Sequence, residues 1–145
     1  ERIMGFANRI LHQPIEMLPG VEETLDYLLH RSHDLILFTK GHPEEQRLKI
    51  DRSPVGRYFR HLEIVREKDV AAYQELTSRH GLPAALTWMV GNSPKSDINP
   101  ALEAGLNAVF VPHERTWALE KTELRAPGPG QLHIVETFAD LRKIF

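Results

Sequence analysis

The sequence predicts an α/β fold in which a mostly parallel β-sheet is covered by helices on both faces. Short apolar runs, which are typical of buried strands, alternate along the chain with segments whose apolar residues recur at helical spacing. The run over residues 35–38 does not alternate with polar residues, as expected for a strand that is buried on both faces. Strands separated by single helices need crossover connections, and these make neighbouring strands parallel.

Composition restricts the class of protein further. The 145 residues, of which 41% are hydrophobic and 26% charged, fit one soluble globular domain. The 18 basic and 20 acidic residues give a net charge of -2 without a basic stripe, so we expect neither a nucleic-acid nor a membrane partner. There is no cysteine, which excludes disulfides, thiolate metal sites and cysteine nucleophiles and fits a cytoplasmic location. The apolar runs are too short to span a bilayer.

Five segments are expected to be strands, because each is a short apolar run with turn residues near its ends. They are residues 35–39, 62–65, 87–91, 107–111 and 132–135. Parallel sheets bind ligands at the carboxyl ends of their strands, so polar residues that follow these runs are the first candidates for a functional site.

Helices are expected over five segments, which begin near Val21, Pro43, Asp69, Ile98 and Phe138. Proline is tolerated in the first turn of a helix, and the acidic residues after Pro43 suit the positive end of the helix dipole. Asp69 can cap the third helix, which should end near His80 because Gly81 follows it.

The segment Thr39-Lys40-Gly41 is a candidate anion site at the end of the first expected strand. A hydroxyl, the N–H groups of a glycine turn and the start of a helix would all point their positive ends toward one place. His42, in the same loop, is a weaker candidate for contact with a substrate. The alternative is a threonine that only finishes the strand and forms a local hydrogen bond.

Lys68 follows the expected strand over residues 62–65. An ammonium group at this place could neutralise a phosphate or a carboxylate intermediate. The alternative is a solvated lysine between two acidic neighbours, Glu67 and Asp69.

The segment over residues 91–97 places a glycine, polar groups and an acid between a strand and a helix. Asn92 and Asp97 offer oxygen ligands of the kind that Mg²⁺ prefers. The alternative is that Ser96 or Asp97 only caps the helix that follows.

Taken together, these three segments resemble the motifs of the haloacid dehalogenase-like (HAD) phosphohydrolases. Thr39 after an apolar run resembles the second motif of that family, and Lys68 before a helix resembles the third. Met89-Val90-Gly91-Asn92-Ser93, followed by Asp97, resembles the fourth. The order and the spacing agree, since 29 residues separate Thr39 from Lys68 (68 − 39) and 24 separate Lys68 from Asn92 (92 − 68).

The resemblance implies a Rossmann-like core and a Mg²⁺-dependent hydrolysis of small phosphorylated substrates. In that family an aspartate attacks phosphorus and forms a phosphoaspartate, which water then hydrolyses. Thr39, Lys40, Gly41 and Lys68 would bind the phosphoryl group, with Thr39 and Lys68 acting in catalysis. Asn92 and Asp97 would hold the metal ion.

The chain departs from the family pattern in two places. Asn92 stands where the family usually has an aspartate. The first motif, Asp-x-Asp after an apolar strand, does not occur before Thr39, where Asp26 and Asp34 are the only aspartates. We therefore expect the nucleophile to lie upstream of this chain and the chain alone to be inactive. Residues 1–17 are expected to be the end of a helical cap.

The domain division that follows is a cap segment over residues 1–17 and a HAD-like core over residues 18–145. The core should lack its central strand, which in this fold lies between the strands over residues 35–39 and 87–91. The gap would leave two rows of unpaired backbone groups, and the chain alone should be unstable. Two other functions stay open, namely a non-catalytic binding module on the same fold and a haloacid dehalogenase, which attacks carbon without a metal.

Overall fold

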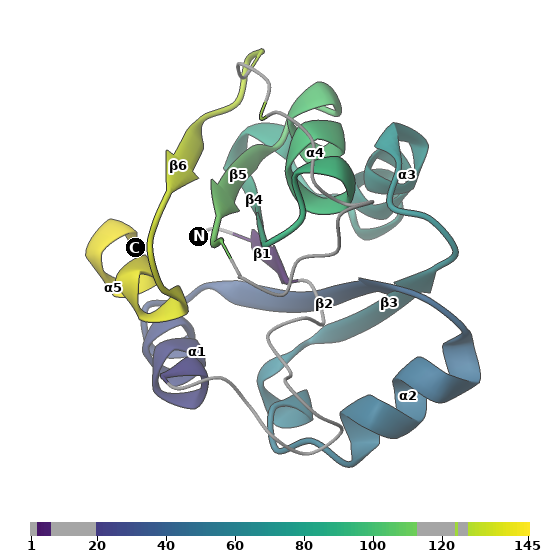
Figure 1. Cartoon of the computed structure of the whole chain (residues 1–145), viewed down its shortest axis with the longest axis vertical. Coiled ribbons are helices and arrows are strands. Elements are labelled where there is room, and N and C mark those ends of the chain that lie inside the picture. The colour runs from purple at the N-terminus through teal and green to yellow at the C-terminus, as the bar shows by residue number, and fades with distance from the viewer. Residues whose placement is uncertain (1–2, 7–19, 113–123, 125–127) are drawn as a thin grey trace.

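In the residues that the structure describes, a six-stranded sheet forms the middle of three layers (Figure 1). The structure is a computed structural model, and it describes residues 3–6 (backbone only), 20–112, 124 and 128–145. The strand order is β3-β2-β1-β4-β5-β6, and every neighbouring pair is parallel. The predicted α/β class and the parallel sheet are therefore confirmed.

The strands lie close to their predicted positions. They are β1 (Ile3–Phe6), β2 (Asp34–Lys40), β3 (His61–Val65), β4 (Thr87–Gly91), β5 (Asn107–Phe110) and β6 (Leu132–Ile134). All five predicted strands are present, and β1 is additional.

The helices of the described ranges follow the strands in alternation. They are α1 (Val21–His30), α2 (Pro43–Asp51), α3 (Val70–His80), α4 (Asn99–Glu103) and α5 (Leu141–Ile144). Asp69 caps α3 as predicted, since its carboxylate accepts from the Ala72 N–H at 2.9 Å. The helix expected from Ile98 differs, because a π-helical turn, η4 (Pro94–Ile98), precedes a short α4. Short 3-10 turns are η2 (Gly56–Tyr58), η3 (Ala84–Leu86) and η6 (Phe138–Asp140).

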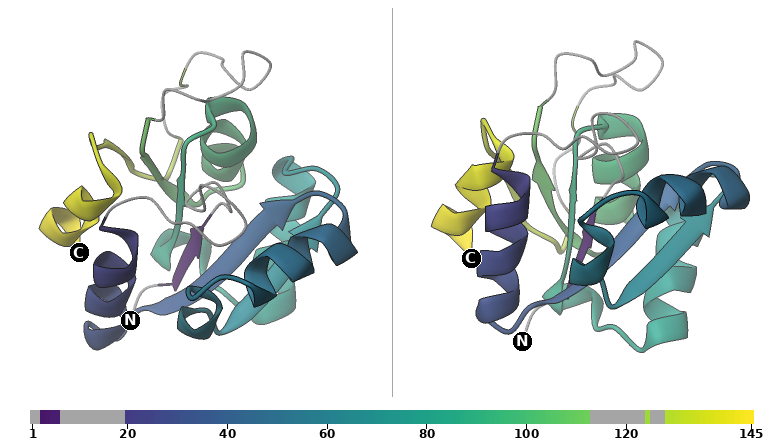
Figure 2. Two further views of the ribbon diagram at one scale, coloured as in Figure 1. Left: turned by 60° about the horizontal axis from the view of Figure 1, so that its bottom comes forward. Right: turned by 90° about the horizontal axis from the view of Figure 1, so that it is seen from below.

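Both faces of the sheet are covered, which explains why β2 is apolar at successive positions. Leu35 and Leu37 pack in the same cluster as residues of α1, α2 and α5 on one face. Ile36 and Phe38 pack with residues of α3 and α4 on the other face. Successive side chains of a strand point to opposite faces, so a strand in a middle layer needs apolar residues at both parities. Figure 2 shows the helices on the two sides of the sheet.

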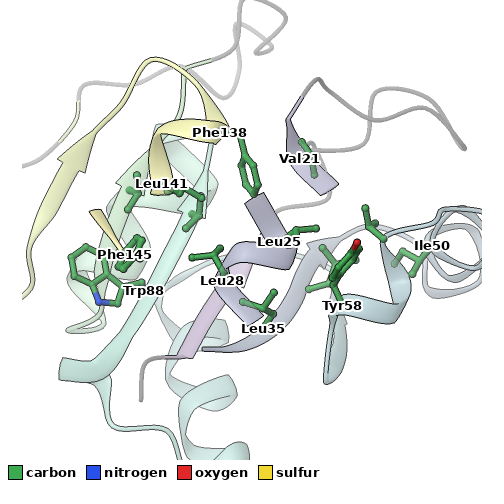
Figure 3. Packing of buried hydrophobic residues seen from close by; sticks show 14 residues of the cluster. Val21, Leu25, Leu28, Leu35, Ile50, Tyr58, Trp88, Phe138, Leu141 and Phe145 are labelled. Carbon is green, nitrogen blue, oxygen red and sulfur yellow. The ribbon is translucent and has the colours of Figure 1, made fainter. Parts of the chain in front are cut away.

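The larger core cluster lies under α1 and α5 (Figure 3). Leu25 and Leu28 of α1 are fully buried there, and the rings of Trp88 and Phe145 meet edge to face with centroids 5.0 Å apart. Full burial of one such side chain stabilises a fold by about 1.5–3 kcal/mol. The cluster therefore fixes the sheet on the face that lies opposite α3 and α4.

Strand β1 corrects the prediction that the chain lacks its central strand. β2 and β4 do not pair directly, and β1 lies between them, with Ile3 opposite Asp34 on one side and Thr87 on the other. The place of the central strand was thus predicted correctly, whereas its absence from this chain is wrong. Pairing on both sides satisfies the backbone groups of the two flanking strands, which removes the reason for predicting that the chain is unstable.

The predicted cap segment over residues 1–17 is only partly within the described residues. Residues 3–6 form β1, so a helical cap is wrong for these four residues. Residues 1–2 and 7–17 lie outside the described ranges, and the division into residues 1–17 and 18–145 stays a prediction. Within the described ranges, no helix has the length and hydropathy that crossing a membrane requires.

Candidate active site

A buried ion pair joins the segments that follow β3 and β4. The Nζ of Lys68 lies 2.6 Å from Oδ1 of Asp97, and the two side chains are 4% and 2% exposed. Lys68 is not the solvated lysine of the structural alternative, because its neighbours Glu67 and Asp69 are exposed while Lys68 is buried. Two buried charges of this kind are tolerated only when they are paired closely and their other atoms are hydrogen-bonded.

The second carboxylate oxygen of Asp97 is held by the backbone that follows β4. The N–H groups of Asn92 and Ser93 donate to Oδ2 at 3.1 and 3.0 Å. This position of the carboxylate requires Gly91, because a Cβ at residue 91 would lie 2.3 Å from Oδ2. The glycine of the motif thus lets the acid fold back against the end of its own strand.

The π-helical turn η4 places Asp97 in this position. The N–H groups of Asp97 and Ile98 both donate to the Ser93 carbonyl, at 2.8 and 3.1 Å. The Ser93 hydroxyl accepts from the Ser96 N–H at 3.0 Å, so Ser93 is the capping residue. The alternative that Ser96 or Asp97 caps the helix is therefore wrong. Single π-helical turns are rare and are often found at functional sites.

Tyr73 of α3 contacts the π-helical turn η4 through its hydroxyl group. Its hydroxyl donates toward the carbonyl oxygens of Ser96 and Asp97, which lie 2.8 and 3.2 Å away. Burial, and then the charge of Asp97, raise the pKa of Tyr73 well above its usual value of 10.0. The sequence predicts Tyr73 only as part of the helix that begins near Asp69. The signal was available, because a tyrosine buried in a core needs a partner for its hydroxyl.

Lys40, the last residue of β2, reaches the same turn from the other side of β1. Its Nζ donates to the Ser96 hydroxyl at 3.2 Å. Lys40 has the same parity along β2 as Phe38, and the Lys68 ammonium lies 6.0 Å from the centroid of the Phe38 ring. Lys40, Lys68 and Asp97 therefore gather on the face of the sheet that α3 and α4 cover, at its carboxyl edge.

The predicted contacts of Gly41 with a phosphate and of His42 with a substrate stay predictions. Gly41 has a φ of +143°, and its N–H donates to the Val65 carbonyl at 2.9 Å, which continues the pairing of β2 with β3. His42 is exposed and precedes α2, where its carbonyl accepts from the Gln46 N–H at 3.0 Å. Neither contact involves Lys68 or Asp97.

Thr39 is fully buried one residue before Lys40. Its hydroxyl lies 3.5 Å from the Lys40 carbonyl, which is long for a hydrogen bond. In the part of the chain that the structure describes, no contact joins Thr39 to Lys68 or Asp97. The structure thus brings Lys40, Lys68, Asn92 and Asp97 together, and it leaves Thr39 at the same edge of the sheet without a direct link to them.

A cavity of about 260 Å³ opens beside the ion pair, between the start of α3 and α4. Three carboxylates and two ammonium groups are among the residues that line it: Glu67, Lys68, Asp69, Lys95 and Glu103. This mixture does not select for an anion.

The sequence of residues 1–111 matches the model of the haloacid dehalogenase-like hydrolase family. The chain belongs to this family. No curated protein matches the chain. The HAD assignment made from the motifs is confirmed, and the match covers all of the segments that form the site.

Solved structures agree with the family. A haloacid dehalogenase-like family hydrolase from Xanthomonas campestris is 28% identical with a TM-score of 0.77, and the match covers 92% of this chain and 55% of that chain. The protein YfnB from Bacillus subtilis, solved with bound magnesium, is 16% identical with a TM-score of 0.72 (89% and 56%). The 2-haloacid dehalogenase from Pseudomonas syringae pv. tomato is 24% identical with a TM-score of 0.62 (88% and 52%). The chain thus spans about half the length of these proteins.

The predicted magnesium ligands of this HAD chain, Asn92 and Asp97, do not form a metal site in their present arrangement. Oδ1 of Asp97 pairs with Lys68, and Oδ2 accepts from two backbone N–H groups. Asn92 contributes a neutral amide where a carboxylate would bring charge. Among the described residues, no group of three or more His, Asp or Glu side chains could hold a metal ion. Hard cations such as Mg²⁺ need several oxygen ligands, and the described residues bring only Asn92 and Asp97 together here, so the predicted magnesium site stays a prediction.

Proposed function

We propose that the chain forms the phosphate-binding part of a HAD phosphohydrolase that acts on small phosphomonoesters. The observation that carries this proposal is the buried Lys68–Asp97 pair at the carboxyl edge of a parallel sheet, with the backbone N–H groups after β4 directed at the same carboxylate. Ligands of open α/β sheets bind at this edge. Pairing with Asp97 fixes the position of the Lys68 ammonium. A cation in a fixed position can stabilise negative charge that develops at one point of the site.

In the proposed reaction, an aspartate oxygen attacks phosphorus while the ester P–O bond breaks. The leaving alcohol takes a proton, and water then attacks the phosphoaspartate, which releases orthophosphate and restores the carboxylate. Lys68 would offset the charge that collects between the nucleophile and the phosphoryl group, and the Thr39 hydroxyl would donate to a phosphoryl oxygen. Asp97 would position Lys68. No step is assigned to Mg²⁺, which stays a prediction for the whole enzyme.

The nucleophile is not one of the aspartates that precede Thr39. Asp26 is exposed on α1, and Asp34 begins β2, at the edge of the sheet opposite to Lys40. The central strand β1 lies within this chain, which removes the reason for expecting the nucleophile upstream, and the proposal assigns the nucleophile to neither of these aspartates.

The test uses the whole protein that contains residues 1–145. Phosphate release from p-nitrophenyl phosphate is measured with and without Mg²⁺, and Lys68→Met should abolish it. Lys49→Met is the matched control, because Lys49 is an exposed lysine in α2, and it should leave the rate unchanged. Ester hydrolysis by residues 1–145 alone would show that the nucleophile is assigned wrongly.

A haloacid dehalogenase is the second candidate. Asn92 favours it, because a site that attacks carbon does not need the carboxylate that is missing here. Chloride release from 2-chloropropionate, without phosphate release from the aryl ester, would decide for this function. Phosphate binding without either product would decide for a non-catalytic module.

A further inference from the structure

We propose that Tyr73 is a positioning residue of this site, whose hydroxyl keeps the η4 turn in the geometry in which the Asp97 carboxylate meets the Lys68 ammonium. The inference rests on the proposed function and adds to it the residue that positions Asp97. It starts from the two oxygen atoms that the Tyr73 hydroxyl contacts, which are the carbonyl oxygens of Ser96 at 2.8 Å and of Asp97 at 3.2 Å.

The backbone of η4 is the first argument. In an α-helix, the carbonyl of Ser96 would accept a hydrogen bond from the N–H of the residue four positions later. That residue is Pro100, which has no N–H to donate. The hydroxyl of Tyr73, which belongs to the neighbouring helix α3, donates to this carbonyl. A contact between two elements therefore takes the place of a hydrogen bond within one helix.

The double contact between Asp97 and the α3 region is the second argument. Lys68, two residues before α3 begins, pairs with the Asp97 carboxylate at 2.6 Å. Tyr73, within α3, contacts the backbone carbonyl of the same aspartate. The carboxylate can meet the ammonium only while the backbone of Asp97 stays at this distance from α3. Tyr73 contacts that backbone directly, so its hydroxyl helps to set the distance.

The rigid surroundings of the Tyr73 ring are the third argument. Tyr73 and Phe38 of β2 are both fully buried, and their rings meet edge to face with centroids 5.0 Å apart. The Lys68 ammonium lies 6.0 Å from the centroid of the same Phe38 ring. The hydroxyl and the ammonium are thus positioned against one side chain of the sheet before a ligand arrives. Less conformational entropy is then lost when the site binds its ligand.

The experiment compares Tyr73→Phe with the unsubstituted protein, using the whole protein that contains residues 1–145. The amide protons of Asn92 and Ser93 report on the position of Asp97 in NMR spectra, because they donate to its Oδ2. Both signals should move upfield in the variant, since these hydrogen bonds lengthen when the turn is held less closely. The kcat for phosphate release from p-nitrophenyl phosphate should fall about three- to tenfold, the usual effect of losing one hydrogen bond, with KM nearly unchanged.

Tyr58→Phe is the matched control. It removes a hydroxyl that contacts the Arg57 guanidinium at 2.8 Å, and Tyr58 belongs to the core cluster on the opposite face of the sheet. This variant should move neither the two amide signals nor kcat. Thermal melts check that each variant is folded. If Tyr73→Phe is not, Tyr73→Phe/Pro100→Ala replaces it, because the second change returns an N–H four residues after Ser96, and the same effects are expected at a smaller size.

Two results would overturn the inference without touching the proposed function. One is a folded Tyr73→Phe variant whose Asn92 and Ser93 amide signals coincide with those of Tyr58→Phe. The other is an unchanged kcat in Tyr73→Phe while Lys68→Met abolishes phosphate release. If the unsubstituted protein releases no phosphate, the proposed function fails, and the amide signals then decide by themselves whether Tyr73 positions the aspartate.

Discussion

Replacing one partner of the Lys68–Asp97 pair should destabilise the fold strongly. The side chains are 4% and 2% exposed, so either substitution leaves a charge that water does not reach. Breaking a buried pair in this way costs about 3–5 kcal/mol. Lys68→Met should lie at the lower end of this range, because Asp97 keeps two backbone N–H donors. Asp97→Asn should lie at the upper end, because the buried ammonium loses its carboxylate.

The assay is urea unfolding of the two single variants and of the double variant Lys68→Met/Asp97→Asn. The double variant contains neither charge, so no unpaired charge is left buried. Its loss in free energy of unfolding should be smaller than the sum of the losses of the two single variants, by about 0.5–3 kcal/mol. Arg60→Met is the control, since Arg60 forms an exposed pair with Asp34 and its loss should cost no more than about 1 kcal/mol. Equal losses for Lys68→Met and Arg60→Met would refute the reasoning.

Three further predictions concern residues around the site and at the end of the chain. Gly91→Ala should lower the free energy of unfolding by about 1–3 kcal/mol in urea, because the added Cβ would overlap Asp97, and an unchanged midpoint would contradict the close approach. Burial raises the pKa of Tyr73 above 10.0, so the contribution of its neutral phenol to stability is complete below that pH and is lost as the pH rises further. The free energy of unfolding of Tyr73→Phe should therefore fall less steeply with rising alkaline pH than that of the unsubstituted chain. Equal slopes for the two proteins would count against this prediction. Backbone hydrogen bonding from Thr137 lowers the pKa of Asp140 below 3.8, so this carboxylate stabilises the fold above that pH and loses its effect as the pH falls through the lowered value. Asp140→Asn should accordingly melt at a lower temperature than the unsubstituted chain at pH 7 and at nearly the same temperature in strong acid, and a pH-independent difference would contradict the assignment.

The sheet could be predicted from the sequence where strands are buried on both faces. The run over residues 35–39 is apolar at both parities because helices cover both sides of β2, and this pattern survives in a single sequence. β1 could not be found in this way. It has only four residues, and it is defined by its two neighbours rather than by its own pattern.

The candidate site was predictable to the extent that it depends on strand ends. Lys68 and Asp97 follow parallel strands, and this alone places them at one edge of the sheet. The contacts that fix them were not predictable. The π-helical turn depends on one carbonyl, that of Ser93, accepting two N–H groups, and nothing in the residue types distinguishes it from an ordinary helix start. The Lys40–Ser96 contact likewise depends on the length of a side chain across a strand that the sequence did not reveal.

The position of β1 has a consequence for the order of folding. Most pairings in the sheet close short loops: Ile36 to His61 spans 25 positions (61 − 36), and Trp88 to Asn107 spans 19 (107 − 88). The pairing of Ile3 with Thr87 spans 84 (87 − 3). Contacts so distant along the chain close slowly and raise the contact order. The pairing of Ile3 with Asp34 spans only 31 (34 − 3), so we expect β1–β2–β3 and β4–β5–β6 to form first as two separate sub-sheets, and the β1–β4 pairing to join them last. Because Lys68 follows β3 and Asp97 follows β4, the two residues belong to different sub-sheets, and their buried ion pair would form only in this final step.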